Sequence, residues 1–257
     1  MLDVVSAAQP VRLEHQPAPA WLRELCGLDE QTVEEDGTPA ALALLDRVLV
    51  GGPGGSERPA TASLVPSDRD ALLAAVYRRA FGDRVQATAS CVDCRELFDV
   101  EFSLAALEQA LQEVRQAPEV TVDNGSFSLA DGTRFRLPTG ADECEVVGLP
   151  LEQAEAELRE RLVLGGDGVA AEEAMAALAP LLERELELVC PECGTAQTLR
   201  FELAGYLLRA LAQERRQLAR EVHALAVAYG WGLAEILALP RSRRRAYVEL
   251  ASARRRA

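Results

Sequence analysis

The chain has 257 residues, with 27 basic and 41 acidic side chains, and a formal net charge of −14. At this length it can bury a substantial core without a metal or disulfides, so a metal would shape part of the fold rather than rescue it. The acidic balance argues against general binding of nucleic acid, because most of the surface would repel the phosphate backbone.

The beginning of the chain predicts neither a secretion signal nor a membrane anchor. Residues 1–5 lack the basic stretch and apolar core of a signal peptide. No run in the sequence approaches the roughly 18 apolar residues needed to cross a bilayer. We therefore expect a cytoplasmic protein, in which paired thiols are more often metal ligands than disulfides.

Residues 1–66 are predicted to be a poorly defined segment. Prolines break its beginning, Trp21–Cys26 is compatible with one or two helical turns, and the apolar stripe of residues 38–50 predicts a short helix. The glycine- and proline-rich stretch 51–59 is typical of a linker. The ordered domain is expected to begin after it.

Helices and a small β unit are predicted in the middle of the chain. Ser67-Asp68-Arg69-Asp70 has the form of a capping box and predicts a helix that stops near Gly82. Residues 104–116 predict a second helix. Alternating residues within 120–137, with Asn-Gly and Asp-Gly turn signals, predict two or three short strands. The stretch 141–182 is helical in character, with breaks at its glycines and prolines.

The last part of the chain, residues 204–257, is predicted to be a helical arm. Apolar positions from Leu207 to Tyr229 share one face and predict one long helix that Gly230 ends. A short helix stopped by Pro240 and a basic final helix follow. Aromatic and guanidinium groups at this corner form a candidate partner-binding surface, with a packed helical corner as the alternative: Tyr229, Trp231, Arg243, Arg244, Arg245 and Tyr247.

Two Cys-x-x-Cys pairs organise the whole sequence. Phenylalanine and leucine follow the second cysteine of each pair at the same spacings, and every matched position is offset by 99. The repeat predicts two copies of one knuckle hairpin, in which a strand enters, two thiols cap the turn, and a second strand leaves into a helix. The matched residues are Cys91, Cys94, Phe102 and Leu104, and Cys190, Cys193, Phe201 and Leu203.

We predict that the two hairpins share one structural Zn²⁺ held by four thiolates, because two thiols leave a tetrahedral ion half-coordinated. The second knuckle is the stronger signal, since Pro191 fixes the turn and Gly194 lets backbone amides approach the sulfurs. In the first knuckle Val92 and Arg95 take these places. A helix, a small sheet and further helices must be inserted between the knuckles. The alternatives are a site that has lost its metal, a thiol–disulfide pair, or two unrelated thiol pairs.

No other constellation in the sequence predicts catalysis. A redox role is disfavoured, because both pairs lie between strands and neither opens a helix. Cys26 and Cys144 lack a ligand-spaced companion and are expected to be buried small hydrophobes. His223 is expected to be a packed or surface histidine. Phosphate loops, nucleophile elbows and His-Glu-x-x-His motifs are missing from the sequence, so we expect a non-enzymatic protein.

The order of these motifs resembles the baseplate hub assembly chaperone family of T4-like contractile tails, and more closely its relatives in bacterial extracellular contractile injection clusters. The resemblance covers roughly residues 67–252 and is carried by a few short motifs: Phe135-Arg-Leu-Pro-Thr139, Cys190-Pro-Glu-Cys193, Arg220-Glu-Val-His-Ala-Leu-Ala226, Tyr229-Gly-Trp231, Ile236-Leu-Ala-Leu-Pro240 and Arg243-Arg-Arg-Ala-Tyr247.

This resemblance implies a non-enzymatic assembly factor for the baseplate hub or its spike, made in the cytoplasm of the producing bacterium. Its partners would be hub or spike proteins, without a small-molecule substrate or a membrane. The family's knuckle thiols map onto Cys91, Cys94, Cys190 and Cys193. A structural baseplate component of the finished particle and a zinc-ribbon protein that binds nucleic acid are the alternatives.

Together the sequence predicts an α+β fold, more helix than strand, in three consecutive parts. Residues 1–66 form the poorly defined segment with its linker. Residues 67–203 form a discontinuous four-cysteine zinc ribbon with an inserted β unit. Residues 204–257 form the helical arm.

Overall fold

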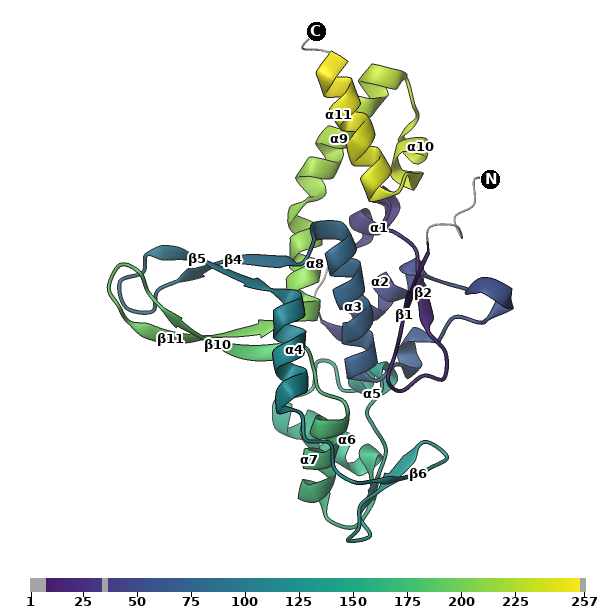
Figure 1. Ribbon diagram of the computed structural model, residues 1–257, viewed down its shortest axis with the longest axis vertical. Coiled ribbons are helices and arrows are strands. Elements are labelled where there is room, and N and C mark those ends of the chain that lie inside the picture. The colour runs from purple at the N-terminus through teal and green to yellow at the C-terminus, as the bar shows by residue number, and fades with distance from the viewer. Residues whose placement is uncertain (1–7, 34–36, 255–257) are drawn as a thin grey trace. The chain divides into compact units, whose positions relative to one another are not determined.

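The computed structural model describes residues 8–33 and 37–254 and confirms the predicted α+β class, with more helix than strand (Figure 1). Two sequence predictions fall outside the described residues: the lack of a secretion signal at residues 1–5, and the basic side chains of Arg255 and Arg256. Within the described part, every helix is too short or too polar to cross a membrane.

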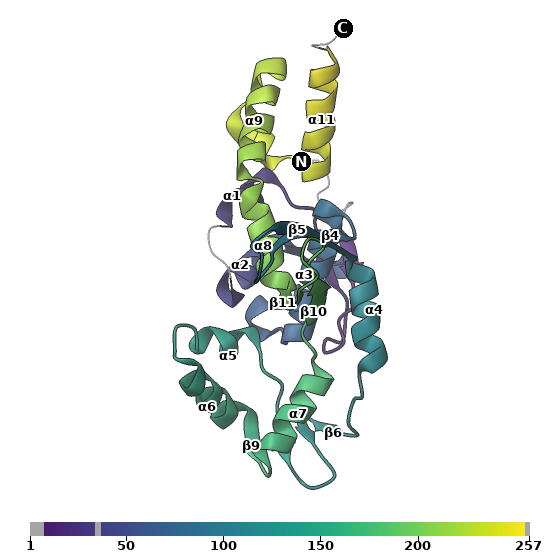
Figure 2. The ribbon, with the colours of Figure 1, turned by 90° about the vertical axis from the view of Figure 1, so that its left-hand side faces the viewer.

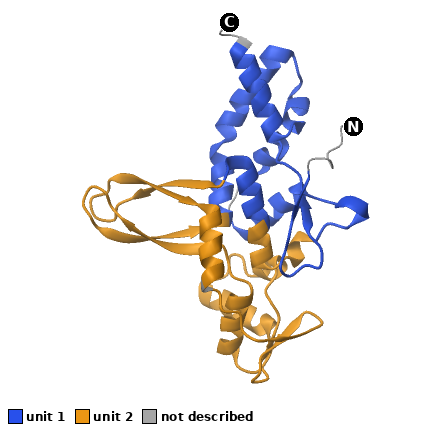
Figure 3. Cartoon of the chain, viewed as in Figure 1, with its two compact units in different colours: residues 1–59, 72–82, 204–257 blue, residues 60–71, 83–203 orange. Residues whose placement is uncertain are grey.

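The chain forms two compact units that alternate along the sequence (Figure 3). Unit 1 contains residues 1–59, 72–82 and 204–257, and unit 2 contains residues 60–71 and 83–203. The sequence predicted three consecutive parts, whereas unit 1 joins the beginning of the chain to its end. The backbone shows this directly, because the Arg241 amide donates to the Leu25 carbonyl at 2.8 Å and Cys26 forms a β-bridge with Pro240.

The N-terminal part of unit 1 is ordered, contrary to the expectation for residues 1–66. A sheet of order β1-β2-β3 and two helices form it: β1 (Gln9–Val11), β2 (Ala20–Leu22), α1 (Gly27–Thr32), α2 (Thr38–Val48) and β3 (Leu49–Val50). The predicted helix over residues 38–50 is confirmed as α2. The helical turns expected from Trp21 are wrong, because Ala20 and Leu22 are buried on one face of a strand that pairs on both sides.

The helical arm in unit 1 is built from four helices: α8 (Leu203–Gln213), α9 (Arg215–Tyr229), α10 (Leu233–Ala238) and α11 (Arg241–Arg254). The long helix predicted through residue 229 is confirmed except for one interruption, because Glu214 is a turn residue that divides it into α8 and α9. The Glu214 amide is shared between the carbonyls of Ala210 and Leu211 at 3.2 Å each. Gly230 ends α9 in the left-handed conformation, as predicted, and α9 and α11 lie side by side (Figures 1 and 2).

The helix predicted to stop near Gly82 is confirmed as α3 (Pro66–Phe81), and Gly82 ends it with a φ of 87°. The capping box predicted at Ser67 is wrong, because the helix already begins at Pro66 and the buried Ser67 hydroxyl has no hydrogen-bond partner. The division into units passes through this helix, so its second half belongs to unit 1. Two short 3₁₀ turns, Pro53–Gly55 and Thr61–Ser63, lie between β3 and α3.

One part of unit 2 is a four-stranded sheet of order β6-β7-β8-β9 with three helices: β6 (Thr121–Asp123), β7 (Ser126–Ser128), β8 (Arg134–Phe135), α5 (Gly140–Glu145), α6 (Leu151–Leu162), β9 (Val163–Gly165) and α7 (Gly168–Leu178). The predicted strands are confirmed, and Asn124 and Gly125 supply the two positive φ angles of the hairpin turn. The sequence missed β9, because its residues continue the helical pattern of α6. The fully buried Phe135 lies in the core of this part.

The remaining part of unit 2 contains the two knuckle hairpins and one helix: β4 (Arg84–Ser90), β5 (Leu97–Ser103), α4 (Leu104–Val114), β10 (Glu183–Val189) and β11 (Ala196–Glu202). The strand bounds of the second hairpin lie 99 residues after those of the first. The registers match as well, because Arg84 pairs with Ser103 and Glu183 pairs with Glu202. The helices that follow, α4 and α8, keep the same offset. The repeat seen in the sequence is therefore a structural repeat.

Candidate metal centre

The structure brings together the four cysteines of the two knuckles. Their sulfur atoms all lie within 4.8 Å of one another. The Sγ atoms of Cys91 and Cys193 are 3.5 Å apart, and those of Cys94 and Cys190 are 3.7 Å apart. All four thiols are free, since a disulfide would hold its sulfurs at about 2.05 Å.

These distances suit a tetrahedral ion bound by four thiolates. A Zn–S bond of about 2.3 Å sets the edge of a regular ZnS₄ tetrahedron at about 3.8 Å. The two sulfur–sulfur contacts of 3.5 and 3.7 Å match this edge closely. Thiolate is a soft ligand that favours zinc among the common structural metals. The cluster could therefore hold a metal ion.

The two hairpins meet as the halves of an approximate two-fold arrangement. Cys91 contacts the counterpart of Cys94, and Cys94 contacts the counterpart of Cys91, which is the reciprocal pattern of a self-complementary interface. The equivalent rings of Phe102 and Phe201 also touch each other, with centroids 4.9 Å apart and planes at 87°. Figure 1 shows the hairpins β4–β5 and β10–β11 extending alongside each other. The four thiols lie where the two copies meet.

Both knuckles close with the same backbone hydrogen bonds. The Cys91 amide donates to the Glu96 carbonyl at 2.9 Å, and the Cys190 amide donates to the Thr195 carbonyl at 2.9 Å. The residue after the second cysteine adopts a positive φ in each, 64° at Arg95 and 76° in the second knuckle. Glycine reaches this region without steric conflict, whereas arginine is strained there. The first knuckle thus makes the same turn with a less suitable residue.

The inner faces of the hairpins form a narrow apolar layer. Val85, Ala89 and Val100 of the first hairpin and Phe201 of the second are buried, while alternate residues along the strands face solvent. An isolated two-stranded hairpin is marginally stable in water. The apolar layer and the thiol cluster are therefore two of the connections that can hold the hairpins together.

The cluster has one buried side and one exposed side. Cys91 and Cys190 are buried, whereas Cys94 and Cys193 are exposed and offer the route by which an ion enters. Hydrogen bonding to the Thr195 hydroxyl, 3.2 Å from the sulfur, is the largest cause that lowers the pKa of Cys193 to about 6. A backbone hydrogen bond at Glu96 acts to lower the pKa of Cys94, but desolvation and the neighbouring thiols outweigh it and raise that pKa to about 12.

The three aromatic residues predicted to bind a partner form one cluster in unit 1. Tyr229 and Trp231 stack with centroids 4.9 Å apart. Tyr247 of α11 meets the Trp231 ring edge-on at 5.1 Å and the Tyr229 ring at 6.1 Å. All three side chains are half-buried. The cluster packs at the corner between α9 and α11 and still presents part of its rings to solvent, so partner binding at this corner stays a prediction.

Arg244 does not lie on this surface, which corrects its place among the predicted partner-binding residues. Its side chain is fully buried. Its guanidinium donates twice to Glu30 at 2.8 Å and once to Glu221 at 2.7 Å. Burial opposes the charge, but these hydrogen bonds outweigh it and raise the pKa of Arg244. Arg243 is exposed as predicted, and Arg245 is half-exposed.

The ion network around Arg244 was missed by the sequence analysis. Arg241 pairs with Glu30 at 3.2 Å and also with Glu214, and Arg245 pairs with Glu214 at 2.7 Å. One signal could have revealed it. Glu221 lies at helical spacing between Leu218 and Leu225, both buried, and so belongs to the buried stripe of α9.

Of the remaining predictions for single cysteines and histidine, some are confirmed and one is wrong. Cys26 is buried, as expected, and His223 is on the surface of α9. Cys144 is exposed, so the expectation of a buried thiol is wrong. It lies in the last turn of the short helix α5, whose buried contacts are made by Gly140 and Asp142 instead.

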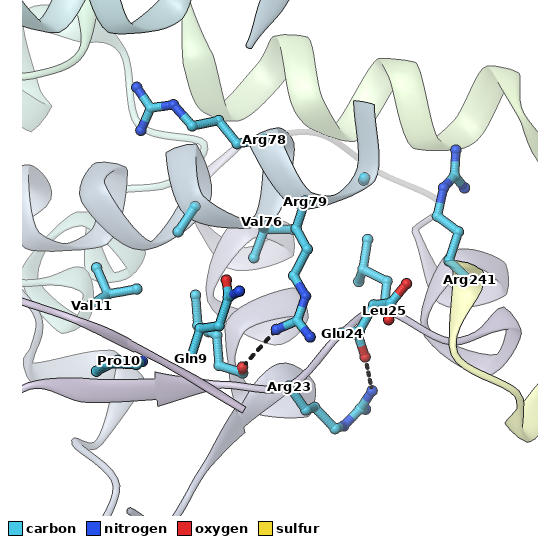
Figure 4. A pocket seen from close by; sticks show the side chains of 13 residues that line it. Gln9, Pro10, Val11, Arg23, Glu24, Leu25, Val76, Arg78, Arg79 and Arg241 are labelled. Atoms are coloured by element: carbon cyan, nitrogen blue, oxygen red, sulfur yellow. Dashed lines mark hydrogen bonds between the residues drawn. The ribbon is translucent and has the colours of Figure 1, made fainter. Parts of the chain in front are cut away.

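A second candidate site is a cavity of about 400 Å³ in unit 1, lined by β1, the residues of and after β2, and α3 (Figure 4). Its polar groups are engaged within the protein. Arg79 donates to the Leu22 carbonyl at 3.1 Å, and Arg23 donates to both oxygens of Asp29 at 2.7 and 2.8 Å. Arg241 is held by its glutamate partners. The cavity therefore has fewer chemical features of a binding site than the thiol cluster.

Comparisons of the chain with protein-family models, curated proteins and solved structures found no match. The fold and the site together define an α+β protein with a four-cysteine cluster that could hold one metal ion.

Proposed function

We propose that the protein is a non-enzymatic, zinc-containing assembly factor for the baseplate hub of a contractile injection particle. The metal part of the proposal is carried by one observation, the convergence of four thiols from two distant knuckles at the spacing of a tetrahedron. The assembly part rests on the resemblance in the motifs between residues 135 and 247.

The chemistry of the cluster favours a structural role for the metal. Four thiolates fill a tetrahedral coordination sphere, whereas a catalytic zinc keeps one position open for water or substrate. The ion would join two hairpins whose thiol pairs are separated by the 95 residues between Cys94 and Cys190.

Metal analysis tests this part directly. Protein purified under reducing conditions without added zinc should contain about one equivalent per chain. A folded, reduced preparation with less than about half an equivalent would exclude the shared zinc site. Cys190→Ser should lose the metal, and Cys144→Ser is the matched control because its thiol lies outside the cluster.

An assembly factor needs a surface that a hub or spike protein can bind. The corner of Tyr229, Trp231 and Tyr247, with the exposed Arg243, offers aromatic rings and a guanidinium, which are frequent in the centres of protein interfaces. Val227 of α9, Leu233 of α10 and Leu250 of α11 are exposed apolar side chains of the same arm. These features support the arm as the partner-binding part of the chain.

The composition of purified particles distinguishes assembly factor from particle component. A producer that lacks this chain should make particles with a defective hub, and mature sheathed particles from the unmodified producer should not contain the chain. Retention at fixed stoichiometry would favour a structural baseplate protein instead.

Nucleic-acid binding by the basic end is the less supported function, because Arg241 and Arg244 are buried in ion pairs with glutamates. Salt-dependent binding of DNA or RNA that is lost on removal of residues 241–257 would support it.

A further inference from the structure

The first knuckle is held in place by a residue of the other hairpin. The side-chain amide of Gln197 in β11 accepts a hydrogen bond from the Val92 amide at 2.9 Å and donates to the Ser90 carbonyl at 3.2 Å. These two backbone groups flank Cys91, so a single side chain fixes the chain on both sides of a ligand. Gln197 lies on the inner face of its hairpin and is half-buried.

A second contact crosses between the knuckles on the exposed side of the cluster. The Thr195 hydroxyl donates to the Asp93 carboxylate at 3.2 Å and also lies 3.2 Å from the sulfur of Cys193. Thr195 therefore links a residue inside the first knuckle to a ligand in the second. Both cross-connections are made by protein groups alone.

These contacts are not repeated in the opposite direction, and they support the knuckle whose turn residues are less suitable. The counterparts of Gln197, Thr195 and Asp93, which lie 99 residues away, are Phe98, Glu96 and Glu192. The second hairpin thus supports the first, and the first does not return the same support. The supported knuckle is the one that lacks proline and glycine and holds Arg95 at a φ of 64°.

We propose that Gln197 and Thr195 are positioning residues for the metal, which hold Cys91, Cys94 and their turn in the ligand geometry from the opposite hairpin. This inference rests on the proposed metal site. Outer contacts of this kind orient the ligands of a metal and slow its release, because a ligand that leaves the ion stays close to it. Gln197 takes over the role that proline and glycine have in the second knuckle.

The test compares two matched pairs of variants in the full-length, zinc-loaded chain. Gln197→Ala and Thr195→Val remove the cross-connections. Gln86→Ala and Thr88→Val are the controls, because these side chains lie on the first hairpin and bond to Glu101 and Asp99 away from the knuckles. Zinc affinity and the rate of zinc transfer are measured against a chromophoric chelator.

We expect Gln197→Ala to weaken zinc binding by about 10- to 100-fold, Thr195→Val by a smaller factor, and the controls by less than about twofold. Co²⁺ loading adds a spectroscopic readout, since the visible absorption of a four-thiolate site should weaken or change shape in Gln197→Ala and stay unchanged in Gln86→Ala. A merely structural loss would lower stability without changing the Co²⁺ spectrum.

Two results would overturn the inference. One is an affinity of Gln197→Ala within twofold of the unmodified chain. The other is an equal loss in Gln86→Ala, which would show a general weakening of the hairpins. If instead the unmodified chain binds no stoichiometric metal, the proposed site itself fails, so the two failures are distinguishable.

Discussion

The knuckle hairpins of unit 2 and the ion network of unit 1 both connect distant segments of the chain, but they do so with different chemistry. Each joins segments that are far apart in the sequence. Cys94 and Cys190 are 96 positions apart, and Glu30 and Arg244 are 214 positions apart. The hairpins use four thiols, two of them exposed, whereas the network uses charges that are buried and paired with one another.

The difference lies in what each connection needs from outside. A thiol cluster gains its full strength from an ion, so its contribution depends on metal, pH and reducing conditions. The ion network is made of protein groups alone, although the Nη1 atom of Arg244 and the Nε atom of Arg241 are buried without a hydrogen-bond partner, and breaking it leaves charges in a medium that solvates them poorly. With an ion in the cluster, removal of the metal should loosen the hairpins reversibly, whereas the ion network should not respond to metal removal.

Loss of a metal ligand should have the largest effect and should be confined to the hairpins. In Cys190→Ser, we expect amide hydrogen exchange in residues 84–103 and 183–202 to accelerate by about a hundredfold or more, because binding of zinc to a small site contributes on the order of 10 kcal/mol. Exchange in α9 and α11 should stay unchanged. Hydrogen exchange with mass spectrometry measures both, and equal acceleration in α9 would contradict the separation of the two regions.

Arg244→Ala should destabilise unit 1 by about 3–5 kcal/mol, because Glu30 and Glu221 would remain buried without their partner. Arg243→Ala is the control. Arg243 is the exposed neighbour of Arg244, so its replacement should change the free energy of unfolding by less than about 0.5 kcal/mol. Chemical denaturation followed by circular dichroism provides both values. Zinc content should be the same in both variants, and a loss of zinc in Arg244→Ala would refute the independence of the two connections.

Asp70 should make the base of the second hairpin sensitive to pH. Its carboxylate accepts the Leu182 amide at 2.8 Å, just before β10. Burial raises its pKa from 3.8 to about 6, and the attraction of Arg69 only partly opposes this. Because the folded-state pKa is raised, the contribution of Asp70 to stability is full below pH 4 and is lost as the pH rises through 6. The loss amounts to about 3 kcal/mol.

Asp70→Asn should remove this dependence. The difference in free energy of unfolding between the variant and the unmodified chain should therefore shift by about 3 kcal/mol in favour of the variant from pH 3.5 to pH 7. Asp142→Asn gives the opposite sign. Hydrogen bonds from Arg136 are the main cause that lowers the pKa of Asp142 to about 2, so its contribution is present above pH 4 and is lost as the pH falls. If the difference in free energy of unfolding between Asp70→Asn and the unmodified chain does not change with pH, the prediction is contradicted.

The smallest expected effect comes from the strained turn of the first knuckle. Arg95→Gly should stabilise the zinc-loaded chain by about 0.5–1 kcal/mol, because glycine adopts the φ of 64° without steric conflict. Gly194→Ala, at the matching position, should destabilise it by a similar amount. Denaturation of both variants at equal zinc content measures the pair, and destabilisation by Arg95→Gly would show that the arginine side chain has another role.

Local elements were predicted best where short-range chemistry decides them. The second strand of each hairpin runs into a helix as the repeat indicated, and the Asn124–Gly125 turn forms as expected. The errors occur where a distant contact overrides the local pattern. Residues 20–22 became a strand because β1 and β3 pair with them, and the long arm helix turns where Glu214 meets two arginines of α11.

The sequence by itself determined the repeat of 99 residues, the two thiol pairs and the direction of each hairpin, because these follow from spacing and turn chemistry within a few residues. The tertiary structure alone decided that the thiols pair crosswise, that Gln197 supports the weaker knuckle, and that Arg244 is buried rather than exposed. Each of these depends on which surfaces meet after the chain has folded. The sequence specifies such meetings only through the sum of many contacts, so no single motif reveals them.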